Sequence, residues 1–299
     1  MRDEKPRTST SWDKSSGRDQ EATITATLTS VRSRPVEIAF DRGRHWRAKI
    51  GFVVLAMEQT VEDDVFRLTP DGVGVHFSRV PMNNEATVDT LATMAPDIAQ
   101  AASLIRPETG VDVLCYTCNS GTMVIGEAGV IRSLRAARQQ VKLTTVMTGV
   151  VRALRTLGAR RIAVATPYLD EVNTIVRDFL EDHGFHVVEI QGMNIRNNSE
   201  IDAVDPHFIR AYARSVDRPE AEAVFICCGA LRALDVVADL EGDLGKPVVV
   251  SNQAMMWDCL RVAGVGDQIS GFGRLFELGV TEHHHAVGAL AQSSAATWP

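Results

Sequence analysis

The chain has 299 residues, of which 45% are hydrophobic and 23% charged, so it can bury a sizeable core in roughly two domains. Its formal net charge of -7 excludes a general nucleic-acid binder, which needs a basic surface to neutralise phosphates. The sequence has no apolar run long enough to span a bilayer and no apolar secretory core near its start, so we expect a cytoplasmic protein without a membrane partner.

Residues 1–47 form a polar extension, and the first 22 of them have the composition of an unfolded chain. Beyond residue 48, apolar runs and helical patterns alternate along the chain. We expect strands at 50–55, 73–77, 111–116, 143–146, 161–165, 186–191 and 224–226, and helices at 87–104, 125–138, 150–157, 171–183 and 206–215. Such alternation predicts an α/β fold with parallel sheets and helices on both faces.

One pattern occurs twice in this alternation. Residues 111–122 and 223–232 each begin as an apolar strand, reach a cysteine and continue into small residues that can open a helix. A second matched pair follows at 144–158 and 247–264, where a strand and a small polar turn lead into a helix closed by Gly. The order predicts two pseudosymmetric lobes, with Cys118 and Cys228 facing each other across a cleft between them.

The lobe boundaries follow from this repeat. We place the first lobe at 48–150, joined by the C-terminal segment 268–280, and the second lobe at 151–267. Residues 281–299 are expected to be a flexible tail.

Cys118 and Cys228 stand where strands are expected to end and helices to begin. Backbone N–H groups and partial positive charge at a helix N-terminus favour the thiolate and lower a cysteine pKa. The alternative is that the cysteines fill the core as small hydrophobic residues, which we favour for Cys115, Cys227 and Cys259. For Cys118 and Cys228, the position at a strand end leaves both a reactive thiol and a core residue possible.

Metal and disulfide chemistry fit the cysteine pattern poorly. Five cysteines are an odd number, and a reducing compartment would keep them free. The spacing of Cys115 and Cys118 suits a redox pair or half a zinc site, but alternation along a strand would put the two on opposite faces. The run His283-His284-His285 lies in the tail, so we expect no metal site.

Seven blocks of this sequence carry a resemblance to a known family. They are Tyr116–Thr122, Thr166–Tyr168, Asn198–Ile201, Cys228–Arg232, Gly245–Val248, Ser251–Ala254 and Gly271–Leu275. In this order they resemble the Asp/Glu racemase superfamily, and within it the maleate isomerase and arylmalonate decarboxylase branch, including its members associated with ectoine utilisation. The resemblance spans about residues 50–277.

The resemblance implies two lobes, no cofactor, a small carboxylate substrate and a homo-oligomer of two or more chains. It makes Cys118 and Cys228 the catalytic thiols on the two sides of the substrate. Tyr168 and Asn198 would hold substrate carboxylates, although Tyr168 could instead cap a turn and Asn198 could bond its own loop. Further substrate contacts are expected from Asn119, Ser120, Gly121, Thr122, Gly229 and Ser251, through backbone N–H groups and hydroxyls.

The sequence departs from the family pattern in one loop. Isomerases of the branch have a carboxylate-binding Asn here, preceded by Pro-Ser-Ser, whereas this chain has Gln59 preceded by Leu55-Ala56-Met57-Glu58. Gln59 is longer by one methylene and Glu58 can be anionic. A monoacid or an amino acid is therefore favoured over a dicarboxylate, unless Gln59 is merely solvated.

Facing thiols predict a cofactor-independent isomerase or racemase that acts next to a carboxylate. One thiolate can remove a proton while the other thiol supplies one, or one thiolate can add to an alkene. An arylmalonate-type decarboxylase is the alternative, and it can dispense with Cys118. A cytoplasmic small-molecule binding or sensing protein is the alternative from another class.

Overall fold

The structure, a computed structural model, describes residues 33–279. The expected disorder of 1–32 and the expected tail at 281–299 lie outside these residues. Residues 33–41 belong to a unit of their own and contain no helix or strand, and residues 42–279 belong to a second compact unit.

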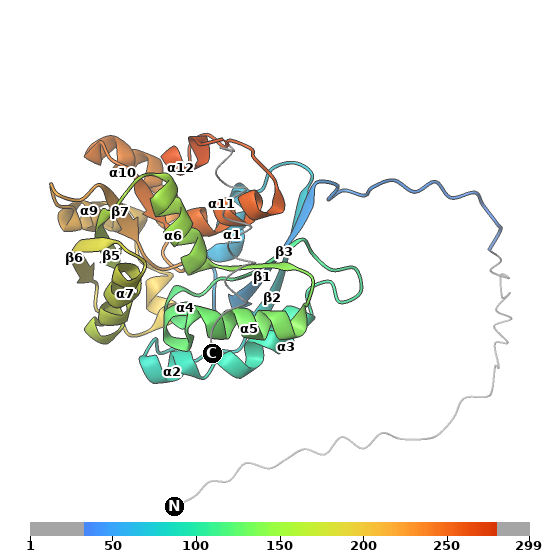
Figure 1. The fold of residues 1–299 in the computed structure, drawn as a ribbon, viewed down its shortest axis with the longest axis horizontal. Helices are drawn as coiled ribbons and strands as arrows, with labels where there is room; N and C mark the ends of the chain where they lie inside the picture. Colours follow the sequence, from blue (N-terminus) through green and yellow to red (C-terminus); the bar gives the residue numbers. More distant parts are fainter. Residues whose placement is uncertain (1–32, 280–299) are drawn as a thin grey trace, which may run out of the picture. The chain divides into compact units, whose positions relative to one another are not determined.

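Two four-stranded parallel sheets form the centre of the unit (Figure 1). The first has the order β2-β1-β3-β4, and the second has the order β6-β5-β7-β8. The strands are β1 Ala48–Leu55, β2 Val73–Val80, β3 Val113–Tyr116, β4 Lys142–Thr145, β5 Arg161–Thr166, β6 His186–Gly192, β7 Ala223–Ile226 and β8 Val248–Val250. Because each strand of one sheet has its counterpart at the same place in the other, the predicted pair of pseudosymmetric α/β lobes is confirmed.

Helices cover these sheets in both lobes. They are α1 Val61–Arg67, α2 Val88–Ala92, α3 Ala95–Ser103, α4 Asn119–Ile125, α5 Glu127–Ala137, α6 Val146–Thr156, α7 Asp170–Asp182, α8 Asn198–Ile201, α9 Pro206–Val216, α10 Val237–Leu244, α11 Ser251–Ala263 and α12 Arg274–Glu277, with a 3₁₀ turn at Ala233–Asp235. Of those in residues 33–279, none is long and apolar enough to cross a membrane.

One expected helix is divided in the structure, and another is shorter than expected. The helix expected at 87–104 is interrupted at Thr93 and Met94, because Pro96 is the second residue of α3, where its missing N–H costs little. The helix expected at 125–138 is α5, and Gly126 with φ +82° separates it from a further helix, α4, which precedes it. The short helices α1 and α8 were not expected at all, since neither carries a long amphipathic pattern.

The strands of the first sheet divide their side chains between two cores, as the alternation of a strand requires. Ile50, Phe52 and Val54 of β1 join a core that continues into the second lobe, whereas Val53 and Leu55 face α3 and α5. The first core therefore joins the two lobes.

Helices α6 and α11 meet where the two lobes join. Gly149 is the fourth residue of α6 and Ala254 is the fourth residue of α11, so the two small residues are equivalent in the repeat. A Cβ placed on Gly149 would lie 2.9 Å from the Ala254 carbonyl oxygen. Arg152 of α6 also reaches Asp258 of α11 at 2.9 Å. The helix that follows the last strand of each lobe thus forms the central contact.

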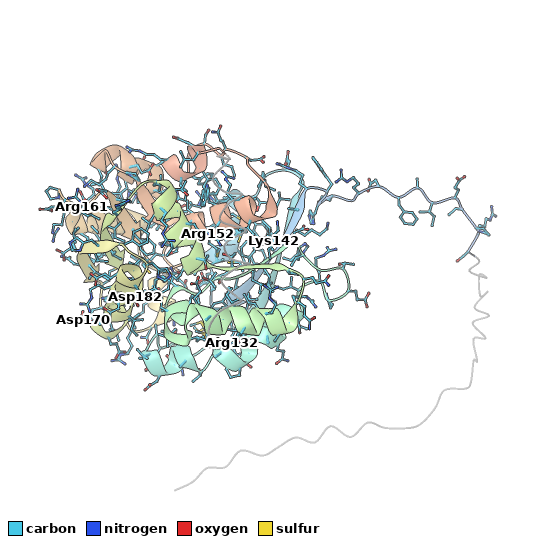
Figure 2. All side chains as sticks on the ribbon, in the orientation of Figure 1. Arg132, Lys142, Arg152, Arg161, Asp170 and Asp182 are labelled. Atoms are coloured by element: carbon cyan, nitrogen blue, oxygen red, sulfur yellow. The ribbon has the colours of Figure 1, made fainter. Side chains whose placement is uncertain are left out.

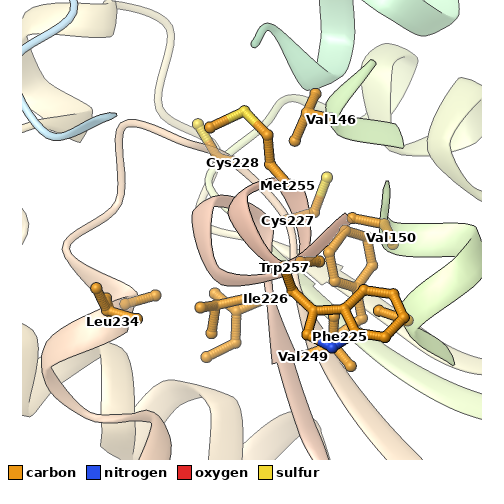
Figure 3. Close-up of a cluster of buried hydrophobic side chains, with 14 of the residues drawn as sticks. Val146, Val150, Phe225, Ile226, Cys227, Cys228, Leu234, Val249, Met255 and Trp257 are labelled. Carbon is orange, nitrogen blue, oxygen red and sulfur yellow. The ribbon is translucent and has the colours of Figure 1, made fainter. Parts of the chain in front are cut away.

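Three cysteines are core residues, as expected. Cys115, Cys227 and Cys259 are fully buried. Figure 3 shows Cys228 and Met255 at one end of a buried cluster whose other end contains Trp257. Charged side chains such as Arg161, Asp170 and Asp182 lie at the periphery of the second lobe (Figure 2).

The C-terminal segment packs along the edge of α10 and α11. The Phe272 carbonyl oxygen accepts a hydrogen bond from Gln253 of α11, and the Arg274 N–H donates to Glu241 of α10 at 2.8 Å. The Arg67 guanidinium lies 5.4 Å from the Phe272 ring centre, so α1 of the first lobe also contacts this segment. The assignment of 268–280 to the first lobe stays a prediction.

Candidate active site

Cys118 lies between β3 and α4. Pairing of β1 with β3 places Val53 opposite Tyr116, and the Thr117 N–H donates to the Val53 carbonyl oxygen at 3.1 Å, so the chain leaves the sheet immediately before Cys118. The thiol then caps α4, because its Sγ accepts the Gly121 N–H at 3.2 Å and lies 3.7 Å from the Ser120 hydroxyl oxygen. The expected position of Cys118 at a helix N-terminus is confirmed.

Cys228 occupies the equivalent strand end in the second lobe but has a different local structure. The residues after it form a turn and a 3₁₀ segment, and a regular helix begins only at Val237. Its φ of +135° is rare for a residue with a side chain. The expectation that Cys228 also stands at a helix N-terminus was wrong, because Gly229 and Ala230 continue as a loop.

The Cys228 loop is held in this conformation by α11 and α1. The Cys228 N–H donates to the Ser251 hydroxyl at 3.0 Å, and the Gly229 carbonyl oxygen accepts from Asn252 at 2.8 Å. The Asn252 amide also donates to the buried Asp64 carboxylate at 2.8 Å. A Cβ on Gly229 would lie 2.8 Å from Asn252 Oδ1, so a larger residue here would displace the Asn252 side chain that makes these two hydrogen bonds.

One hydrogen-bonded chain joins the two cysteine loops. Asn119, which follows Cys118, donates from Nδ2 to the Ser251 hydroxyl at 2.9 Å, and that hydroxyl accepts the Cys228 N–H. The Ser251 hydroxyl donates in turn to the Ile226 carbonyl oxygen. Asn119 and Ser251 therefore set the position of one thiol relative to the other across the lobe boundary.

Burial governs the charge state of both thiols. It raises the pKa of Cys118, although the Gly121 N–H and the Ser120 hydroxyl oppose the shift. It raises the pKa of Cys228 to about 12, and the Tyr168 hydroxyl opposes that shift. The expected lowering of the Cys118 pKa by the helix N-terminus was wrong in sign, because removal from water outweighs the N–H donors.

Tyr168 lies against the second thiol. Its side chain is buried, its N–H donates to the Thr166 hydroxyl at 3.1 Å, and its hydroxyl acts on Cys228 by lowering the pKa of that thiol. The fields of Cys228, Cys227 and Cys118 help raise the Tyr168 pKa well above 10.0, after the larger effect of burial. The phenol is therefore a neutral donor beside the thiols.

Gln59 and Asn198 are hydrogen-bonded to other parts of the protein. Gln59 Nε2 donates to Asp202 at 3.0 Å, beside an open cavity of about 670 Å³ that is lined by α1 and the Arg232 loop. The Asn198 amide donates to the Asn84 carbonyl oxygen at 3.0 Å and thereby joins the loops of the two lobes. Both side chains are engaged within the protein, and their contact with a substrate stays a prediction.

The remaining small residues divide into two groups. Thr122 is fully buried and donates to the Cys118 carbonyl oxygen at 2.6 Å, and a Cβ on Gly121 would lie 2.9 Å from Cys118 Sγ. These two residues shape the Cys118 loop. Ser120 lies beside the thiol itself, and its contact with a substrate stays a prediction.

Glu58, which the sequence suggested only as a possible anion, lies near both thiols. Its charge raises the pKa of both Cys118 and Cys228. It stands directly before Gln59, whose contact with a substrate stays a prediction. The replacement of Pro-Ser-Ser by a segment ending in Glu is the signal for it in the sequence.

Groups of three or more His, Cys, Asp and Glu side chains that could bind a metal do not occur within residues 33–279. Two thiols, a phenol, a hydroxyl, a carboxylate and backbone N–H groups are the polar groups at this site.

We expect alkylation to modify Cys118 first, Cys228 second and the other three cysteines last. Cys118 and Cys228 are 6% and 8% exposed, whereas Cys115, Cys227 and Cys259 are fully buried. Because the thiolate is the nucleophile and both pKa values are raised, labelling should accelerate as the pH rises above neutral. Mass-spectrometric mapping after substoichiometric iodoacetamide measures the order, and earlier labelling of Cys115 or Cys259 would contradict it.

Comparison with known proteins connects this geometry to a family. The family model of arylmalonate decarboxylase matches residues 94–276. Arylmalonate decarboxylase of Bordetella bronchiseptica is 29% identical over 242 residues, which cover 76% of this chain and 96% of that protein. Maleate isomerase of Nocardia farcinica is 27% identical over 242 residues, which cover 76% of this chain and 94% of that protein.

A solved structure is similar over the same region. A cysteine-to-serine mutant of the Nocardia farcinica maleate cis-trans isomerase, with a covalently bound succinylcysteine intermediate, is 26% identical, with a TM-score of 0.71. The similarity covers 77% of this chain and 98% of that one. The similar protein thus carries its reaction intermediate on a cysteine.

Proposed function

This chain belongs to the arylmalonate decarboxylase family, and we propose that it is a cofactor-independent isomerase that uses Cys118 and Cys228 on opposite sides of a small carboxylate substrate. The relatives that are maleate isomerases support the expected isomerase activity. The proposal that both thiols act on one substrate rests on one observation. Hydrogen bonds from Asn119 to Ser251 and from the Cys228 N–H to Ser251 join the two cysteine loops.

The different surroundings of the two thiols suit two different tasks. Cys118 receives the Gly121 N–H and is the group that can become a thiolate, whereas Cys228, with a pKa of about 12, remains a thiol and can donate a proton. In a racemisation, a carbon–hydrogen bond breaks as Cys118 gains the proton. The Cys228 S–H bond breaks as a new carbon–hydrogen bond forms on the opposite face. Two bases on two faces are what inversion requires.

The same site supports a cis–trans isomerisation. The Cys118 thiolate would form a carbon–sulfur bond with an activated alkene, and the electron pair of the double bond would move onto the substrate carboxylate. The former double bond is now single, so the substrate can rotate about it. Cleavage of the carbon–sulfur bond then restores the double bond and releases the other isomer. In either reaction, backbone N–H groups and the Ser120 hydroxyl stabilise the negative charge that develops on the substrate carboxylate.

Decarboxylation is the second candidate, because the family model is that of arylmalonate decarboxylase. Loss of carbon dioxide would leave an enediolate that one thiol protonates. The presence of a cysteine at both strand ends favours isomerisation, since decarboxylation uses only one of them. Location in the cytoplasm, a role in ectoine utilisation and assembly into a homo-oligomer complete the proposal.

Proton NMR in deuterium oxide tests the reaction class with a panel of amino acids, maleate and arylmalonates. We expect exchange of a proton next to a carboxylate, or conversion of alkene signals. Release of carbon dioxide without either signal would replace the isomerase by a decarboxylase. Tight binding of a panel member without any chemical change would favour a sensing protein.

A further inference from the structure

The loop that carries Glu58 forms one wall of the site. The Thr60 hydroxyl donates to the Ala230 carbonyl oxygen at 2.9 Å, two residues beyond Cys228. A Cβ on Gly229 would lie 3.2 Å from the Val61 side chain. The loop begins where β1 ends, beside the end of β3 that leads to Cys118. Glu58 is therefore held between the two cysteine loops.

The Glu58 carboxylate accepts hydrogen bonds from the backbone N–H groups of this wall. Its Oε1 accepts the N–H groups of Gln59, Thr60 and Val61 at 3.1, 2.8 and 3.2 Å. Three consecutive N–H groups are a favourable surrounding for a carboxylate. A substrate carboxylate cannot bind these donors, because the chain's own carboxylate already occupies them.

Two carboxylates lie at this wall. Burial raises the pKa of Glu58 and the charge of Asp202 adds to that shift, whereas the three N–H groups favour the ionised carboxylate. Arg79 directs its guanidinium to the Glu58 carbonyl oxygen at 3.1 Å and to the Glu62 carboxylate at 2.9 Å. A second substrate carboxylate at this wall would meet the Glu58 carboxylate.

We propose that Glu58 selects a substrate with a single carboxylate and a protonated amine, such as an amino acid, and rejects dicarboxylates. This inference rests on the proposed function, since it concerns the same cleft between the thiols. The substrate ammonium faces Glu58 and neutralises the negative charge of its carboxylate. The carboxylate lies at the opposite end, toward the Ser120 hydroxyl and the Tyr168 phenol.

Binding measurements test this selection without requiring turnover. Four probes of the same chain length separate the charges: butyrate, succinate, 2-aminobutyrate and 4-aminobutyrate. A ligand that binds the folded protein raises its melting temperature by mass action, so thermal shifts at equal ionic strength rank the four probes. We expect at least one aminobutyrate to bind tenfold or more tightly than succinate, and the better isomer locates the amine.

The variant Glu58→Gln removes the charge and keeps an oxygen for the three N–H groups. Its preference for the aminobutyrate should fall at least tenfold, and its affinity for succinate should rise. Asp63→Asn is the matched control, because it removes one exposed carboxylate from the adjacent helix α1 and should leave the ranking unchanged.

The outcomes separate the two proposals. Succinate binding to the unaltered protein as tightly as the aminobutyrates would overturn the selection by Glu58, even if the enzyme isomerises another acid. An unchanged ranking in folded Glu58→Gln would do the same. Clear selection of an aminobutyrate without proton exchange would support the selection and contradict the isomerase. If Glu58→Gln does not fold, the ranking by the unaltered protein decides.

Discussion

Replacement of Cys228 by Ala is expected to leave a folded protein whose turnover is about 10²–10⁴ times lower, the usual contribution of a positioned acid or base. The change removes the proton donor from one side of the substrate. The backbone of the loop keeps its bonds to Ser251 and Asn252, because both involve main-chain atoms of Cys228 and Gly229. The rate of proton exchange or alkene conversion measures the loss, and circular dichroism measures the fold.

Cys115→Ala is the control for this prediction. Cys115 is a fully buried core residue of β3, so its replacement should lower stability slightly and leave turnover near its original value. A folded Cys228→Ala protein with near-original turnover would exclude the two-thiol reaction. Cys118→Ala adds a second distinction, since only a decarboxylase could retain turnover without Cys118.

The repeat in the sequence was sufficient to predict the lobes, since matched strands before Cys118 and Cys228 led to two sheets of the same strand order. The repeated strand and helix patterns were therefore enough to predict the architecture. They did not predict the local conformation of each loop. The positive φ of Cys228 depends on Ser251 and Asn252, which lie more than twenty residues later in the chain.

The sequence indicated the two cysteine loops but not the surroundings of the charged groups near them. Nothing local in the sequence shows that Glu58 turns back onto the N–H groups of the next residues, whereas Gln59 turns outward to Asp202. The sign of the Cys118 shift was also inaccessible, because the pKa depends on how completely the folded lobes exclude water.

Gly149→Ala is expected to destabilise the protein by about 1–2 kcal/mol, although alanine is the better helix former by up to about 1 kcal/mol. The added methyl group would meet main-chain atoms of α11, the Ala254 carbonyl oxygen at 2.9 Å and the Met255 Cα at 3.1 Å. Neither can rotate away as a side chain can. The two helices must separate, and the clash outweighs the gain in helix propensity.

This separation should also lower turnover, because α11 begins with Ser251, which holds the Cys228 N–H and accepts from Asn119. Gly129→Ala is the matched control, since its methyl group would meet side chains and no main-chain atom, Ile125 at 3.3 Å and Arg132 at 3.8 Å. There the helix propensity should dominate and stability should rise. If the α6–α11 contact sets the distance between the lobes, chemical denaturation should show opposite changes in stability for the two variants, and only Gly149→Ala should lose turnover. Equal effects of both substitutions would show that the lobes tolerate a wider crossing and that the thiols are positioned by their own loops alone.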